Sequence, residues 1–170
     1  MSYQTGDLAA APAPDVRIAL YLDIDGVLLR RTRQQGFGAM SLYEVASGAT
    51  ELLEWATANF DVFWLSTRTS GGSIENAERA FRHASPSAMR SDRFSSLIRS
   101  IPASQWDTAK ISGIDTAKPF FWIDEDPDPI SVAHLSENDL MHRLIKVSVD
   151  REPDLLNSLP GVITERMKSR

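Results

Sequence analysis

Four short apolar runs, separated by longer stretches with helical spacing, constrain the fold of this chain more than any other feature. Each run has the length of a strand and is rich in β-branched or aromatic residues. The first three are continuous, as expected of parallel strands covered on both faces, whereas the fourth partly alternates and suits a sheet edge. The runs are Ile18–Leu22, Val62–Leu65, Phe120–Ile123 and Leu144–Val149.

Apolar residues at helical spacing lie between and after these runs. We expect helices over Thr50–Asn59, Ser73–His83 and Ser104–Gly113, and a short final helix over Thr164–Arg170 with Thr164 as its cap. Strands that alternate with helices predict an α/β fold, built as a three-layer open parallel sheet. In such sheets, ligands bind at the carboxyl ends of the strands.

Two other segments have no clear pattern. Ser85–Pro102 is compatible with a short edge strand or with loop and helix only. Arg30–Ser41 contains Gly36 and Gly38, and we interpret it as a loop or hairpin that overhangs the end of the first strand.

Composition places the chain among globular proteins and limits its metal chemistry. The 170 residues suit one domain, which we assign to residues 16–170, after a flexible leader over residues 1–15. We find neither a secretion signal nor an apolar run near the length of a membrane span, and predict a cytoplasmic protein. A net charge of -5 disfavours a broad nucleic-acid-binding face. Without cysteine and with only three histidines, any metal would be held by oxygen, as magnesium, calcium or manganese are.

The first apolar run ends in Asp23-Ile24-Asp25-Gly26-Val27. Side chains alternate along a strand, so Asp23 and Asp25 share a side. Crowded carboxylates repel unless a cation or a shared proton intervenes. The pair therefore indicates a metal or acid–base site, although a strand followed by an Asp-Gly turn is the simpler alternative.

Two more strand ends carry reactive groups. Ser66, Thr67 and Arg68 follow the second run, and their hydroxyls and guanidinium suit a phosphate, unless the segment only caps the next helix. The third run ends in Asp124-Glu125-Asp126-Pro127-Asp128, whose four acids favour a bound cation over a solvated acidic turn. The sequence leaves open which of these acids would bind it.

Two lysines that could balance the acids lie upstream of the third strand end. Lys118 directly precedes the third strand and is expected at its far end, so Lys110 is the better candidate, with a solvated surface lysine as the alternative. Arg30, Arg31 and Arg33 form a basic cluster beside the first site, either to meet an anionic substrate or as a solvated loop.

In this order, the motifs resemble those of the haloacid dehalogenase (HAD) superfamily of phosphotransferases. Asp23–Leu28 resembles its first motif, Ser66 the second, Lys110 the third, and Asp124-Glu125 the fourth, with DE where the family often has DD. The resemblance spans about Arg17 to Val149 and implies a Rossmann-like HAD fold.

Two phrases are also similar to particular branches of that superfamily. Ser66-Thr67-Arg68 is similar to the Ser-Gly-Arg of polynucleotide phosphatases, and Phe121–Asp126 resembles a small branch that includes domains of RNA-repair proteins.

The resemblance implies a reaction and assigns residues to it. Asp23 would be the nucleophile that forms an aspartyl-phosphate, and Asp25 the general acid and base. Ser66 and Lys110 would stabilise the transferring phosphoryl group. Thr67 would contact the substrate, and Arg68 would either contact the substrate or brace the site. Mg²⁺ would be bound by Asp23, by the backbone carbonyl of Asp25, and by Asp124 and Glu125.

The spacing of the motifs excludes a full cap domain. Only 41 positions separate Asp25 from Ser66, and 14 separate Lys110 from Asp124. Capless members of the family tend to act on large substrates, or close the site over small ones by oligomerisation. We therefore expect a magnesium-dependent phosphomonoester hydrolase. The alternatives are a non-catalytic HAD-like binding or scaffold protein, and a nucleotide or polynucleotide end-processing phosphatase, which the acidic pI disfavours.

Overall fold

A four-stranded parallel sheet forms the centre of the computed structural model, which describes residues 17–32 and 43–168. The strand order is β4-β1-β5-β6, which confirms the α/β class and the edge position of the fourth apolar run. The strands are β1 (Ala19–Leu22), β4 (Asp61–Trp64), β5 (Phe120–Asp124) and β6 (Leu144–Lys146). Their register places Leu22 beside both Trp64 and Ile123, so three carboxyl ends meet at one edge.

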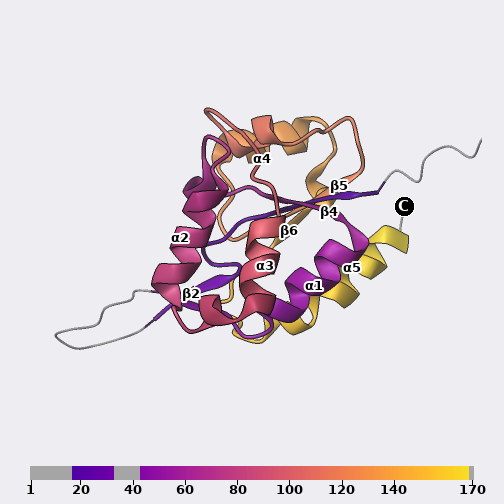
Figure 1. Ribbon diagram of the computed structural model, residues 1–170. Helices are drawn as coiled ribbons and strands as arrows, with labels where there is room; N and C mark the ends of the chain where they lie inside the picture. The colour runs from indigo at the N-terminus through magenta and orange to yellow at the C-terminus, as the bar shows by residue number, and fades with distance from the viewer. Residues whose placement is uncertain (1–16, 33–42, 169–170) are drawn as a thin grey trace, which may run out of the picture.

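Helices cover both faces of the sheet. Alternate strand residues contribute to two apolar clusters, with Leu20 and Leu22 in one and Tyr21 and Trp122 in the other. The first cluster includes buried residues of α1, α2, α3 and α5, and the second includes Leu135 of α4 (Figure 1). The helices are α1 (Ala49–Asn59), α2 (Ile74–Ala84), α3 (Asp92–Ser100), α4 (Pro129–Glu137) and α5 (Leu159–Lys168).

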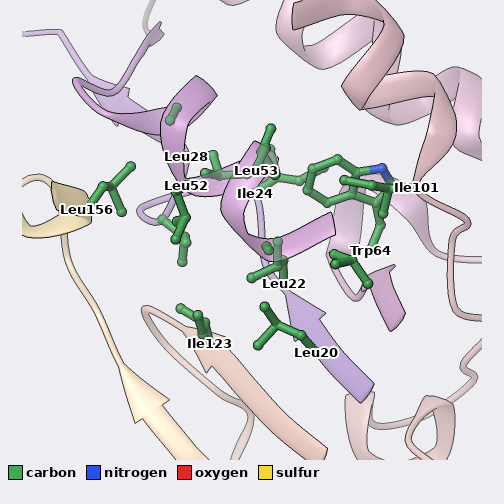
Figure 2. Packing of buried hydrophobic residues seen from close by; sticks show 14 of the residues in the cluster. Leu20, Leu22, Ile24, Leu28, Leu52, Leu53, Trp64, Ile101, Ile123 and Leu156 are labelled. Atoms are coloured by element: carbon green, nitrogen blue, oxygen red, sulfur yellow. The ribbon is translucent and has the colours of Figure 1, made fainter. Parts of the chain in front are cut away.

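Figure 2 shows how the larger cluster fills the space between β1 and α1. Leu22 and Ile24 project toward the side chains of Leu52 and Leu53, and Trp64 lies beside Ile101. All of these side chains are buried. Burying a leucine or isoleucine contributes about 1.5–3 kcal/mol, so the segment that leads from β1 into the Asp23 turn is firmly anchored.

The predicted helix over Ser104–Gly113 is wrong. The segment is irregular until a single 3₁₀ turn, η3 (Lys110–Gly113). Local bonds replace helical ones: the Ser104 hydroxyl donates to the Gly113 carbonyl at 3.0 Å, and the Asp107 N–H donates to the Ser112 hydroxyl at 3.3 Å. Serine side chains that bond to nearby backbone groups compete with helix formation in this way.

The C-terminal helix begins earlier than the sequence predicts. It starts at Leu159, and Thr164 is not its cap but an interior residue whose hydroxyl donates to the Pro160 carbonyl at 2.7 Å. Proline in the first turn is compatible with a helix start, since it lacks an N–H that would be unpaired there. The last two residues of the predicted helix lie outside the described residues.

Helices also occupy places that the sequence left unassigned. Ser85–Pro102 contains α3 and no edge strand; the Ser91 hydroxyl caps α3 by accepting the Phe94 N–H at 3.5 Å. Helix α4 follows the acidic segment directly and begins at Pro129. No helix in the described parts of the chain is long and apolar enough to cross a membrane.

A small antiparallel hairpin follows the first strand. It pairs β2 (Leu29–Arg31) with β3 (Tyr43–Val45), and Arg30 forms an ion pair with Glu44 across it. The hairpin interpretation of the overhanging segment is thus confirmed at its base. Its remaining residues, 33–42, which include Arg33, lie outside the described residues, as does the predicted leader over 1–15.

Candidate active site

Two buried carboxylates meet at one buried ammonium group where the strands end. Lys110 Nζ lies 2.9 Å from Asp23 Oδ2 and 2.7 Å from Asp124 Oδ2. The side chains of Lys110, Asp23 and Asp124 are only 7%, 10% and 0% exposed. The residues come from η3, the end of β1 and the end of β5, so the fold itself assembles this triad from distant parts of the sequence.

Backbone and indole donors fix the direction of both carboxylates. Asp23 Oδ1 accepts the Ile24 N–H at 2.8 Å. Asp124 Oδ1 accepts the Asp126 N–H at 2.9 Å, and its Oδ2 accepts Trp122 Nε1 at 3.1 Å as well as Lys110. A site whose groups are already oriented loses little free energy to reorganisation when a ligand binds.

Asp128 positions Lys110 through the backbone. Its Oδ2 accepts the Lys110 N–H at 3.1 Å, and its Oδ1 caps α4 by accepting the Ser131 N–H at 2.8 Å. The other candidate lysine lies elsewhere: Lys118 is 67% exposed and pairs with Asp115 at 2.9 Å. The structure therefore brings Lys110, and not Lys118, to the strand-end carboxylates.

The triad has more negative than positive charge. Burial, reinforced by the charge of Asp23, raises the pKa of Asp124 to about 7 despite the nearby Lys110 ammonium. Burial also opposes the charge of Lys110, but the two carboxylates outweigh it and raise the pKa of the lysine above its ordinary value. Lys110 is thus charged at neutral pH, and the site could accommodate further positive charge.

Asp25 shares the site but has a different partner. Arg68 Nε donates to both carboxylate oxygens of Asp25, at 2.9 and 2.8 Å, and its Nη2 lies 2.8 Å from Oδ1. The guanidinium also lies 5.0 Å from the centre of the Tyr43 ring, a cation–π distance. Arg68 is therefore held between the β3 hairpin strand and Asp25.

Of the two neighbouring hydroxyl residues expected at the phosphate, the structure brings Thr67 but not Ser66 to the cavity. Ser66 is fully buried and caps the 3₁₀ turn η1 (Thr67–Thr69), where its hydroxyl oxygen accepts the Arg68 N–H at 3.3 Å. Thr67 is exposed and lines the cavity over the site, whereas Ser66 is not among the described residues that line it.

The cavity over the triad has a volume of about 320 Å³. It is lined by Asp23, Asp25, Arg31, Thr67, Trp106, Thr108, Lys110, Glu125, Asp126 and Asp128. Asp23 and Asp25 were predicted to lie on the same side of the chain, and both line this cavity. Ile24, which lies between them in the sequence, is buried in the core. Arg31 of the predicted basic cluster also reaches the cavity.

Glu125 packs against the turn that follows Asp25. Its Oε1 accepts the Ser148 hydroxyl at 2.6 Å. Gly26 adopts φ +71°, and a Cβ at this position would lie 1.8 Å from Glu125 Oε2. The Asp-Gly turn is therefore present next to the buried carboxylates, and glycine is required there by conformation and by space.

The predicted magnesium ligands are only partly grouped. Within the described residues, no three Asp, Glu or His side chains are arranged to hold a metal. Asp23 and Asp124 converge, whereas the Asp25 carboxylate faces Arg68 and Glu125 faces Ser148. Two carboxylates with excess negative charge still fit Mg²⁺, which is usually bound by one or two carboxylates and keeps several waters.

Sequence reasoning missed several residues of the site. Trp122 supplies a hydrogen bond to Asp124 and lies two positions before it, on the same strand face, so strand periodicity was an available signal. Tyr43 and Trp106 reach the site from a hairpin and a loop, for which periodicity offers no guide.

Comparisons of the chain with protein-family models, with curated proteins and with solved structures give no match.

Proposed function

We propose that the protein is a magnesium-dependent phosphomonoester hydrolase that acts through an aspartyl-phosphate on Asp23. The observation that carries this proposal is the Lys110 ammonium bridging Asp23 and Asp124 at the carboxyl edge of a parallel sheet. A surface ion pair would stabilise the fold equally well at less desolvation cost. A buried, oriented carboxylate that opens on a cavity is instead suited to nucleophilic attack.

Asp23 would attack the phosphorus atom of the substrate through one carboxylate oxygen. The Asp23–phosphorus bond forms as the bond from phosphorus to the alcohol oxygen breaks, and Asp25 in its protonated form gives that oxygen its proton. In the second half, Asp25 accepts a proton from water as the water oxygen attacks phosphorus and releases Asp23. Both carboxylates line the same cavity, as this sequence of steps requires.

The cations of the site would offset the charge of the phosphate. Lys110 already donates to Asp23 Oδ2 and would stabilise negative charge on the transferring group. Mg²⁺, held by Asp23, Asp124 and the backbone carbonyl of Asp25, would supply further positive charge against the repulsion between carboxylate and phosphate. Thr67 is placed to donate its hydroxyl to a phosphoryl oxygen, because it lines the cavity.

The proposed mechanism must account for Arg68, because its guanidinium is paired with the Asp25 carboxylate in the free protein. Its three contacts with the carboxylate orient Asp25 in the free protein. A guanidinium also binds phosphate oxygens in a bidentate manner, so we propose that an incoming phosphate shares or takes over this arginine. Asp25 would then be released to take part in proton transfer.

Substitution of Asp23 by asparagine tests the assigned nucleophile. With p-nitrophenyl phosphate and Mg²⁺, Asp23→Asn is expected to lower kcat by about a thousandfold or more, since the amide cannot form the acyl phosphate. Asp107→Asn is a matched control, because Asp107 is exposed and outside the cavity. Activity that survives in Asp23→Asn would refute the nucleophile, and an inactive wild-type protein would favour a binding or scaffold role.

A further inference from the structure

Trp106 stands out among the residues of the cavity. Of the described residues that line it, Trp106 alone has an apolar side chain, and the others are charged or hydroxylated. The proposed reaction accounts for the carboxylates, Lys110 and Thr67, but it does not use an indole ring. An aromatic wall in a polar cavity therefore needs its own explanation.

The loop that carries Trp106 is fastened on both sides. Before it, Ala103 forms a β-bridge with Trp64, and the Ser104 hydroxyl donates to Gly113. After it, the Asp107 N–H donates to the Ser112 hydroxyl. The half-buried indole also packs against the apolar cluster on the α4 face of the sheet. Trp106 is thus a rigid part of the cavity wall and not a side chain free to swing away.

Hydrogen bonding does not explain the position of this ring. The indole N–H of Trp106 is buried and has no acceptor within the described residues. The N–H groups of Trp64 and Trp122 do have acceptors, at 3.3 Å and 3.1 Å. An unpaired buried donor is unfavourable, so the ring is retained here against that cost. Because the N–H is buried, the surface that the indole can offer a ligand is its carbon ring.

We propose that Trp106 is a specificity-determining residue that stacks on an aromatic ring of the substrate. The inference rests on the proposed phosphatase activity and deepens it: the preferred phosphomonoester carries a planar aromatic group close to its phosphate. The phosphate would bind over Asp23 and Lys110, and the ring would lie on Trp106 in the same cavity. Phosphates of short alcohols such as glycerol have no flat apolar face for this wall.

The kinetic test compares each variant with the wild-type protein on the same substrate, which removes differences in leaving-group reactivity. Trp106→Ala is expected to lower kcat/KM for phenyl phosphate about ten- to a hundredfold, and for glycerol phosphate less than about threefold. Trp106→Phe keeps an aromatic face and should retain most of the activity on phenyl phosphate. Equal losses on both substrates in Trp106→Ala and Trp106→Phe would overturn the inference.

Trp55→Ala is the matched control variant. Trp55 is also half-buried, but it lies on α1, where its ring packs against Phe60 at 5.2 Å between ring centres, outside the cavity. It should lower activity on both substrates by the same factor, if at all. A nucleoside monophosphate, used as a third substrate, distinguishes the two possible sources of the aromatic ring. If Trp106→Ala lowers kcat/KM for it as much as for phenyl phosphate, the ring is a nucleobase. If kcat/KM falls only for phenyl phosphate, the substrate is an aryl ester.

A binding measurement keeps this inference separate from the proposed activity. Calorimetry with phenylphosphonate and methylphosphonate, neither of which is hydrolysed, should show at least about tenfold tighter binding of the phenyl compound to the wild-type protein and little preference in Trp106→Ala. If no phosphate ester is hydrolysed but this preference is found, the proposed function fails and the aromatic site stands. Equal affinities in the wild-type protein would overturn the aromatic site, whatever the activity.

Discussion

Replacing Lys110 with methionine is expected to destabilise the protein by about 3–5 kcal/mol at pH 8, the range found when one partner of a buried ion pair is removed. Lys110 touches two carboxylates at 2.9 and 2.7 Å, and none of the three side chains is more than 10% exposed. Methionine fills a similar volume, so the loss would come from charge and not from a cavity. Asp23 and Asp124 would then be buried together without a cation.

The loss should depend on pH in a defined direction. Burial and the charge of Asp23 already raise the pKa of Asp124 to about 7 in the presence of Lys110. Without the lysine, Asp124 would be protonated still more readily, which removes the repulsion. Destabilisation by Lys110→Met should therefore be larger at pH 8 than at pH 5. Urea denaturation at both pH values, with a chelator present, measures it.

Two further variants complete the test. The double variant Lys110→Met/Asp124→Asn should recover much of the lost stability at pH 8, because only one carboxylate then remains buried at the triad. This double variant should fold even where Lys110→Met alone does not. Lys118→Met is the control: this lysine is 67% exposed in its ion pair with Asp115, so the change should be below about 1 kcal/mol. A Lys110→Met loss no larger than that of Lys118→Met, or independent of pH, would refute the reasoning.

Three other predictions concern the same edge of the sheet. Because the pKa of Asp124 is raised to about 7, the folded protein binds this proton more tightly than the unfolded chain does. The free energy of unfolding should therefore fall as the pH rises from about 4 to 7, by up to about 4 kcal/mol. Asp124→Asn should lack this fall in metal-free urea denaturation, and parallel profiles would contradict the assignment. Gly26→Ala should lose about 1–3 kcal/mol, since φ is +71° and the new Cβ meets Glu125; shortening Glu125 to alanine should recover only part of this loss, because the positive φ remains and the Cβ of residue 125 would still lie 2.8 Å from the new Cβ. Arg68→Ala should lower kcat/KM for p-nitrophenyl phosphate by about ten- to a hundredfold. Arg68→Lys should not restore it, because lysine cannot reproduce the bidentate contact with Asp25. Full activity in Arg68→Ala would contradict this prediction.

The strands could be predicted from the sequence because both faces of the sheet are covered. Each strand then needs a continuous apolar run, as in Phe120–Ile123, and no amphipathic helix has that pattern. The rule that ligands bind at carboxyl ends of parallel strands then brought Asp23, Ser66 and Asp124 to one edge. That much depends only on local pattern and topology.

What the sequence did not predict depended on individual hydrogen bonds and ion pairs that residue spacing does not indicate. Lys110 does lie at the strand-end carboxylates, but it was expected on a helix. The irregular loop around it depends on the Ser104–Gly113 and Asp107–Ser112 bonds. The ion pair between Arg68 and Asp25 joins residues that follow two different strands, β4 and β1, and no spacing in the sequence indicates it.

The acidic segment shows how one signal can carry two meanings. Asp128 was grouped with the acids that could bind a cation, yet it caps α4 and accepts the Lys110 N–H. Asp followed directly by Pro129 is a helix start, because proline is favoured in the first turn. Reading that pair as a start signal would have predicted α4 and would have separated Asp128 from Asp124.

The central claim is that Asp23 carries the phosphoryl group during turnover. The most direct measurement mixes the protein with p-nitrophenyl phosphate and Mg²⁺, quenches the reaction with acid during turnover, reduces any acyl phosphate with borohydride and maps the peptides by mass spectrometry. We predict conversion of Asp23 to homoserine in the wild-type protein and in Asp107→Asn, and none in Asp23→Asn. Steady hydrolysis with Asp23 unmodified, or modification of another carboxylate in its place, would contradict the account.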